Sequence, residues 1–340
     1  MRTLLRILGL LVLTLTALGA VGGGWLAIVY NRPLAAAGAT EQIIEVKSGS
    51  SLRTTANLLL TRGIIADALP VEIMGRLTGA AQKIKPGEYR LSPSMTPRRV
   101  LNAMVDGDVL LHPITLPEGL TVREVMSRLA DAGFGQVPDY QALIQDPELA
   151  ARFGVVTDGV KVPFEGYFFP DTYKFARGTR PEVIVETMLR RLDEVFTPER
   201  EHARGLLGWT RHQVLTMASV IEKETGAPDE RERISAVFHN RLMIGMRLQT
   251  DPTVIYATPD YDGDIRYRDL RRDDPYNTYR HKGLPPGPIA NPGEAAIHAA
   301  LFPANDPALY FVSRGDGTHV FSETVEQHNR AVREYQRRRR

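Results

Sequence analysis

Residues 218–225 read ASVIEKET, and residues 248–256 read LQTDPTVIY. The first stretch ends an apolar-periodic run from Arg211 and predicts a helix that carries a carboxyl group on its apolar side. The second predicts a tight polar loop that enters a short, β-rich strand. A half-buried carboxylic acid facing a polar cleft is what protonation of a glycosidic oxygen requires, so the two stretches together indicate glycan chemistry.

Glu222 is the carboxyl residue on the apolar face of this helix. It follows Leu215, Ala218 and Ser219 by seven, four and three residues, so all four side chains share one face. Apolar and small neighbours keep water away from the carboxylate, which raises its pKa and retains a proton near neutral pH. Glu224 points elsewhere and is the competing candidate. In the alternative interpretation, both are surface residues near a helix end.

The second stretch and a later one supply polar and aromatic groups that suit a sugar. Gln249 and Asp251 are expected to hydrogen-bond hydroxyl or acetamido groups, and the amide of Asn277 suits an N-acetyl group. Tyr256 and Tyr276 present aromatic faces to sugar rings. These five are the predicted substrate-binding residues, although the same residue types also cap turns and pack as loop scaffolding.

Composition places the chain among ordinary folded proteins. It has 340 residues, of which 43% are hydrophobic and 24% charged. The net charge of only +2 predicts no nucleic-acid partner. Cysteine is absent, which excludes disulfides, thiol catalysis and thiolate metal sites. The eight histidines are scattered and form no His-Glu-x-x-His motif, so we expect no metal and no cofactor.

Residues 7–30 form an uncharged apolar stretch that predicts a transmembrane helix. At ~1.5 Å per residue it is long enough to cross a bilayer core of ~30 Å. Arg2 and Arg6 precede it, and the first acidic residue is Glu41. The positive-inside rule therefore places residues 1–6 in the cytoplasm and the remainder outside the inner membrane. The alternative is a signal peptide cleaved near residues 17–20, but the apolar stretch continues well past that point.

The sequence contains an internal repeat, at residues 46–60 and 116–129. Each copy predicts a strand, then a turn marked by glycine, then a helix with a polar start. This order resembles a LysM-type module, a small fold that binds glycans containing N-acetylglucosamine. We therefore expect a LysM-like subdomain at residues 41–107. The alternative is a generic α+β unit with ordinary turn chemistry.

A second, weaker repeat relates residues 85–104 to residues 164–188. In each copy a threonine, Thr96 or Thr179, stands just before a proline. Threonine suits the N-cap of a helix and proline suits its first turn, so helices are expected to begin at both places.

The second half of the chain predicts helices joined by long loops. The helix at 211–225 is expected to end at Gly226, a suitable residue after a helix. Residues 256–293 are rich in proline, glycine, tyrosine and aspartate and predict long, structured loops. The remaining predicted elements are helices at 229–243 and 294–301, a hairpin at 310–312 and 318–321, and a basic end at 337–340.

Several stretches together resemble the endolytic murein transglycosylase family, also called YceG-like. Their order and spacing agree with that family, as does the N-terminal anchor, and the resemblance covers residues 41–335. The stretches are 165–173 (EGYFFPDTY), 218–225, 238–242 (FHNRL), 246–256 (MRLQTDPTVIY), 276–279 (YNTY) and 283–293 (GLPPGPIANPG).

The resemblance implies cleavage of MurNAc–GlcNAc β-1,4 bonds within nascent peptidoglycan strands, which leaves 1,6-anhydro-MurNAc ends and terminates elongation. It also implies that Glu222 is the catalytic glutamate. Our own hypothesis is that Gln249, Asp251 and Asn277 orient the sugar. Because the sugar's own 6-hydroxyl attacks, no second carboxylate is needed to activate water. Penicillin-binding proteins, which polymerise glycan at the membrane, are the implied partners in cell-wall biogenesis and division.

The predicted fold is α+β and contains a single N-terminal transmembrane helix. Two alternatives for the function stay open. A muramidase would use water, with Asp251 or Glu224 as the second carboxylate, and would leave a reducing end. A non-catalytic, glycan-binding scaffold of the cell-wall machinery would explain the anchor and the repeat. The expected parts are a cytoplasmic N-terminus (1–6), the transmembrane helix (7–30), the LysM-like subdomain (41–107), the catalytic domain (108–335) and a basic tail (336–340).

Overall fold

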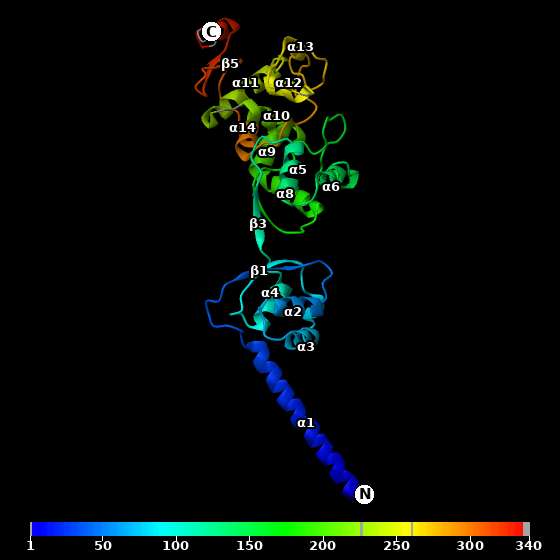
Figure 1. Ribbon diagram of the computed structural model, residues 1–340. Coiled ribbons are helices and arrows are strands. Elements are labelled where there is room, and N and C mark those ends of the chain that lie inside the picture. The colour runs from blue at the N-terminus through cyan, green and yellow to red at the C-terminus, as the bar shows by residue number, and fades with distance from the viewer. Residues whose placement is uncertain (1, 225–226, 260, 336–340) are drawn as a thin grey trace. The chain divides into compact units, whose positions relative to one another are not determined.

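The computed structural model describes residues 2–224, 227–259 and 261–335. The chain divides into two compact units, which contain residues 1–112 with 174–178, and residues 113–173 with 179–340. Helices predominate, and the strands of the described residues form three two-stranded sheets (Figure 1). This mixture of helix and sheet confirms the predicted class in its coarse form. The LysM likeness of residues 41–107 stays a prediction.

The N-terminal helix α1 (Arg2–Asn31) is a continuous apolar helix. Within residues 6–31, an 18-residue window has a mean hydropathy of 2.0, and none of that window is buried within the protein. Such a helix fits a single-pass membrane anchor by length and composition. Its last turn contacts α3 and α4 of the first unit, where Tyr30 joins the hydrophobic core (Figure 1).

The first unit is built on one antiparallel strand pair. Ile44 lies opposite Tyr89 in the register, and both side chains are fully buried. The predicted helix start at Thr96 is confirmed, because its hydroxyl accepts a hydrogen bond from the Arg99 amide and Pro97 occupies the first turn. The elements are β1 (Gln42–Val46), α2 (Leu52–Thr61), α3 (Leu69–Leu77), η1 (Ala80–Gln82), β2 (Gly87–Leu91) and α4 (Pro97–Asp106).

A second strand pair, β3 (Leu111–Thr115) with β4 (Thr172–Ala176), contains residues of both units in each strand. Between these strands lie α5 (Val122–Asp131), α6 (Val137–Leu143) and α7 (Pro147–Arg152).

The prediction that Thr179 caps the next helix is wrong. The N-cap of α8 (Pro181–Val195) is Arg180, which makes no side-chain capping bond. Proline disfavours helical backbone in the residue before it, and Arg180 is accordingly extended, with φ −66° and ψ 140°. The helix therefore begins at Pro181 itself.

Helix α10 (Arg211–Glu224) runs through the core of the second unit. Eight consecutive residues, Val214 to Ile221, are buried, so the helix is covered all round before its last turn. It packs directly against α11 (Arg231–Met243) and α14 (Glu294–Leu301). Helix α14 in turn contacts α9 (Pro198–Leu207). A short helix η2 (Pro228–Glu230) leads into α11. This packing holds the glutamates of the last turn of α10 on a rigid support.

The strand predicted from residue 253 onward is wrong, because the segment forms helix α12 (Asp251–Ala257). Asp251 and Pro252 occupy its first turn, where an acidic side chain and proline both favour a helix start. Thr253 and Val254 are buried, and α12 packs on α10. Tertiary packing thus outweighs the β-propensity of the branched residues.

The C-terminal elements agree with the predicted order. Strands β5 (Tyr310–Ser313) and β6 (His319–Ser322) form the expected antiparallel hairpin, which is followed by α15 (Val325–Tyr335). Loops were predicted at 256–293. Among the described residues of this region, the structure has the end of α12 and one further short helix, α13 (Tyr267–Leu270). The predicted end of α10 at Gly226 and the basic tail lie outside the described residues.

Candidate active site

The last turn of α10 carries two glutamates that face different surroundings. Residues two apart on an α-helix are separated by roughly 200° around its axis. Among the residues that the structure describes, Glu222 and Glu224 accordingly share no hydrogen-bond partner. The two sides of the helix end therefore have to be considered separately.

Glu222 lies in an almost closed polar environment. Its side chain is 9% exposed, and its Oε2 accepts a hydrogen bond of 3.1 Å from the Gly293 amide. A guanidinium nitrogen of Arg231 lies 3.8 Å from Oε1. Burial raises the pKa of Glu222 and the nearby Glu118 carboxylate adds to it, while the Gly293 amide and Arg231 oppose the rise. The predicted desolvation of Glu222 is confirmed, and its catalytic role stays a prediction.

Gly293, beside Glu222, lies close to the Glu118 side chain, which a larger residue at this position would have to displace. A Cβ atom on Gly293 would lie 1.9 Å from a carboxylate oxygen of Glu118. On the other side, the Lys223 ammonium donates to the Gly119 carbonyl at 3.2 Å. These contacts fix the loop that contains Glu118 against the end of α10.

Glu224 lies on the other side of the helix end, at a cavity of about 500 Å³. Its Oε1 accepts a short hydrogen bond from the Thr250 hydroxyl. Burial raises the pKa of Glu224 and the Asp251 carboxylate raises it further, against the lowering effect of the Thr250 hydrogen bond. A protonated carboxyl group at a polar cavity is suited to donate a proton to a bound ligand.

The structure brings Gln249 and Asp251 together with Glu224, because all three line this cavity. Gln249 has a φ of 50°, a left-handed conformation that is uncommon outside glycine and is often found at functional sites. Asp251 accepts a hydrogen bond of 2.7 Å from the Tyr279 hydroxyl. Two predicted substrate-binding residues thus accompany the competing glutamate rather than Glu222.

The other three predicted substrate-binding residues make internal contacts. The Tyr256 hydroxyl donates to Glu165 at 3.2 Å, and the Tyr276 hydroxyl accepts from the Lys161 amide at 3.2 Å. Asn277 is fully buried, and its side-chain amide donates to the backbone carbonyls of three residues that precede it, Asp269, Leu270 and Arg272. These contacts hold the 256–293 loops together. A direct role of the three residues in substrate binding stays a prediction.

Sequence reasoning did not single out several residues that line the cavity. Arg241 donates to the Leu309 carbonyl at 2.7 Å and lies over the Tyr310 ring at 5.4 Å. His328, whose ring stacks on Tyr310 at 5.3 Å, and His319 also line the cavity. Arg241 and Tyr279 lie inside quoted stretches, so the sequence contained a signal for them. For the hairpin residues it contained none, because their position depends on tertiary packing.

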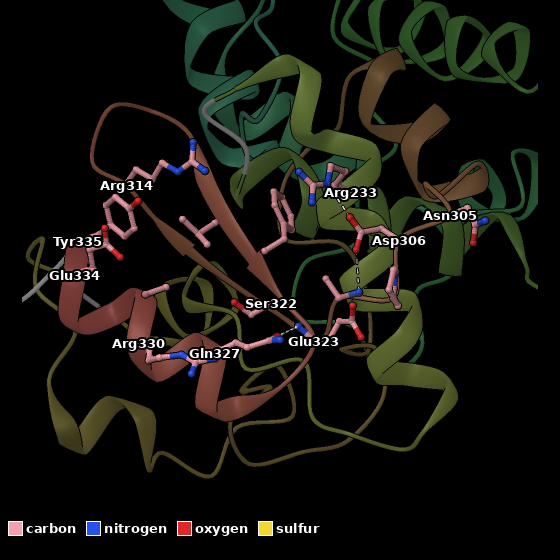
Figure 2. Close-up of a pocket in the computed structure, with 15 residues that line it drawn as sticks. Arg233, Asn305, Asp306, Arg314, Ser322, Glu323, Gln327, Arg330, Glu334 and Tyr335 are labelled. Atoms are coloured by element: carbon pink, nitrogen blue, oxygen red, sulfur yellow. Dashed lines mark hydrogen bonds and ion pairs between the residues drawn. The ribbon is translucent and has the colours of Figure 1, made fainter.

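A separate cavity of about 590 Å³ lies against β6 and α15 (Figure 2). Neither glutamate of α10 lines it. Its Arg233 is engaged internally, paired with Asp306 at 2.8 Å and placed 4.0 Å from the centre of the Phe321 ring. The cavity at Glu224 is therefore the better candidate for chemistry.

Comparison with known proteins gives concordant matches. The model of the YceG-like family matches residues 44–334. The "Endolytic murein transglycosylase" of Bacillus subtilis (strain 168) is 33% identical over 305 residues, which cover 86% of this chain and 84% of the relative. The protein of the same name from Streptococcus pneumoniae serotype 2 (strain D39) is 28% identical and is covered over 58% of its length. A crystal structure of a putative YceG-like protein from Listeria monocytogenes superposes with a TM-score of 0.60, at 32% identity and over 85% of this chain and 98% of that one.

Proposed function

The chain belongs to the YceG-like family, and we propose that it is a membrane-anchored endolytic murein transglycosylase. Its substrate is the glycan strand of peptidoglycan, and the bond broken is the β-1,4 linkage between MurNAc and GlcNAc. The observation that carries this proposal is the partly buried Glu224 carboxyl group, with its raised pKa, at a cavity that Gln249 and Asp251 also line.

The mechanism uses one carboxyl group twice. Glu224, whose pKa burial raises, donates its proton to the oxygen of the leaving sugar. The resulting carboxylate then accepts the proton of the 6-hydroxyl as this oxygen attacks the anomeric carbon, so that a 1,6-anhydro end forms without water. Gln249 and Tyr279 orient the ring through hydrogen bonds. The substrate's acetamido group stabilises the positive charge that develops on the sugar.

Glu224 is preferred to Glu222 for this role because of where each carboxylate is directed. Both oxygens of Glu222 face protein groups, the Gly293 amide and Arg231. Glu222 does not line the cavity that contains Gln249 and Asp251. The sequence-based choice of Glu222 remains the second candidate for the acid.

A hydrolytic reaction is the second candidate function. Asp251 lines the same cavity as Glu224 and raises its pKa, so the two carboxyl groups act on each other. A muramidase requires such a pair, in which the second carboxylate activates water or attacks the sugar. This reaction would leave a reducing MurNAc end in place of an anhydro end.

The placement at the membrane follows from α1. The helix is long and apolar enough to span a bilayer, with Arg2 and Arg6 before it and the first acidic residue at Glu41. The N-terminus then lies in the cytoplasm, and residues 41–335 lie outside the inner membrane. Nascent strands emerge at that surface, so penicillin-binding polymerases are the proposed partners. Residues 41–107 are proposed to bind glycan as a LysM-like subdomain.

Product analysis tests the proposal. The full chain, in detergent, is incubated with uncrosslinked peptidoglycan strands, and the fragments are identified by mass spectrometry. We expect internal cleavage and anhydro-MurNAc ends. Reducing ends would establish the hydrolase instead, and the absence of products with strands freshly made by a polymerase in the same membrane would refute both reactions.

A further inference from the structure

We propose that a cleft beside Glu222 binds the peptide that is attached to MurNAc, which gives the enzyme a subsite for peptide-bearing strands. The inference rests on the proposed function, since it concerns the same substrate. The cleft has a volume of about 670 Å³ and lies outside the Glu224 cavity. Its charged lining residues are Glu118, Arg200, Asp229, Arg231, Glu232 and Glu294, and His298 also lines it.

Arg231 is the residue that points to a ligand. Its Nε is buried and has no hydrogen-bond partner among the described residues. Its ion pair with Glu222, at 3.8 Å, is too long to count as a hydrogen bond. A guanidinium has five donors in a fixed fork, and a buried donor left unpaired is costly. The Arg231 side chain is still 18% exposed, so a carboxylate entering the cleft can pair with the accessible part of its guanidinium through charge-assisted hydrogen bonds.

The other charges of the cleft favour a ligand that carries an amine as well. Arg200 is already engaged, because it pairs with Glu294 at 2.7 Å and donates to the Val195 carbonyl. Glu118, Asp229 and Glu232 are therefore the carboxylates that remain for a cation, apart from a 3.8 Å approach of His298 to Glu232. One underused guanidinium beside three carboxylates complements a ligand that carries an ammonium group as well as a carboxylate. It disfavours a purely anionic ligand such as phosphate.

Peptidoglycan peptides have this chemistry. They carry free carboxylates, and the diamino acid at their third position carries an ammonium group. Four extended residues span about 13–14 Å, whereas a helix with its side chains is about 10–12 Å wide. Glu224 lines one cavity, and Arg231 of the other cleft lies 3.8 Å from Glu222, two residues before Glu224 on α10. A strand with its sugar at Glu224 can thus place its peptide at Arg231.

A binding measurement tests the subsite without requiring turnover. The probe is the free tetrapeptide L-Ala–γ-D-Glu–meso-diaminopimelate–D-Ala, titrated calorimetrically into the full chain in detergent. Arg231→Gln should weaken binding by at least about 10-fold, because it removes a charged hydrogen-bond donor. Arg233→Gln is the matched control, since Arg233 lies two residues later on α11 but pairs with Asp306 outside the cleft.

A second variant covers the case in which Arg231→Gln fails to fold. Glu232 is half exposed in the first turn of α11, and Glu232→Lys should also weaken binding because it repels the peptide ammonium. No binding by the wild type, or equal binding by wild type and both variants, would overturn the proposal.

A kinetic comparison then connects the subsite to catalysis. The wild type should show a higher kcat/KM for peptide-bearing strands than for strands stripped by an amidase, and Arg231→Gln should bring this ratio close to one. An equal loss on both substrates would mean a structural role and would overturn the subsite. A wild type that binds the peptide but cleaves neither substrate would refute the proposed reaction and leave the subsite standing.

Discussion

Glu222 and Glu224 are two residues apart on α10, yet one accepts a hydrogen bond from the Gly293 amide and the other from the Thr250 hydroxyl. The end of the helix therefore separates two polar environments. On one side, a buried ion pair and a close glycine contact hold Glu222. On the other, Glu224 faces a cavity that also contains residues suited to a sugar. The same short stretch of sequence can thus supply both structure and chemistry.

Substitution of the two glutamates, one at a time, assigns the acid. Glu224→Gln keeps the shape and removes the proton, so kcat should fall by roughly 10²–10⁴-fold. Glu222→Gln is the matched control and should retain most of the activity, with some loss of stability from the altered Arg231 contact. Release of anhydro-ended fragments gives the rates. If Glu222→Gln is the inactive variant and Glu224→Gln is not, the sequence-based assignment is right and the cavity assignment fails.

The pH dependence of kcat/KM should report the protonated form of Glu224. The acid is active only below its pKa, which burial raises above the ordinary value, so the rate should fall as pH rises through this pKa. Asp251→Asn removes a charge that raises the pKa and should move the alkaline limb to lower pH. Thr250→Val removes a hydrogen bond that lowers the pKa and should move it to higher pH. Shifts in the same direction would contradict the assignment.

Local sequence pattern predicted much of the fold and one side of the site. The strand β1, helices α4 and α14 and the β5–β6 hairpin follow from periodicity and turn residues close in sequence. The spacing of Ala218 and Ser219 from Glu222 likewise predicted a desolvated carboxyl group, which is observed. These features depend on the few residues around each position, which is why the sequence suffices for them.

The features that local pattern does not decide depend on how the chain packs in three dimensions. Whether Glu222 or Glu224 faces the cavity is decided by where the hairpin, α12 and α15 pack, which no spacing within residues 218–225 encodes. The branched residues of α12 have high β-propensity, and only burial against α10 and the proline of the first turn make them helical. Asn277 carries an amide suited to sugars, but the backbone carbonyls of Asp269, Leu270 and Arg272 in the same buried loop engage it.

Glu165 should make the folded protein less stable as the pH rises. This buried carboxyl group accepts hydrogen bonds from the Val122 amide and the Tyr256 hydroxyl, and burial raises its pKa to about 7. Between pH 4.5 and pH 7, the folded state keeps a proton that the unfolded state releases. The contribution of Glu165 to the free energy of unfolding is therefore fully present below pH 4.5 and is lost as the pH rises through about 7. The loss is of the order of 3 kcal/mol.

The measurement is the melting temperature between pH 5 and pH 8. Glu165→Gln cannot titrate, so its melting temperature should change less over this range than that of the wild type. Parallel curves for the two proteins would show that Glu165 does not control the pH dependence.

Gly166 should tolerate alanine much less well than a glycine in open space. Its φ is +84°, and a Cβ there would lie 2.5 Å from two atoms of the Pro288 ring. Backbone strain of about 1 kcal/mol and overpacking of about 1–3 kcal/mol should add up in Gly166→Ala. Gly208→Ala is the control, because Gly208 has a φ of +67° but no atom within 4 Å of its Cβ position. Equal denaturation midpoints for the two variants would contradict the packing argument.

The absence of cysteine makes the proposed topology directly testable, because a single introduced thiol has no competitor. Leu77→Cys places a thiol on α3, where the native side chain is 75% exposed, and Thr3→Cys places one before the apolar segment. Basic residues near the start of a span favour the cytoplasmic side. In spheroplasts, a membrane-impermeant maleimide should therefore label position 77 at once and position 3 only after lysis. Labelling of position 3 in sealed cells would show that the orientation is the reverse of the proposed one. The catalytic domain would then lie on the side where no glycan strands emerge.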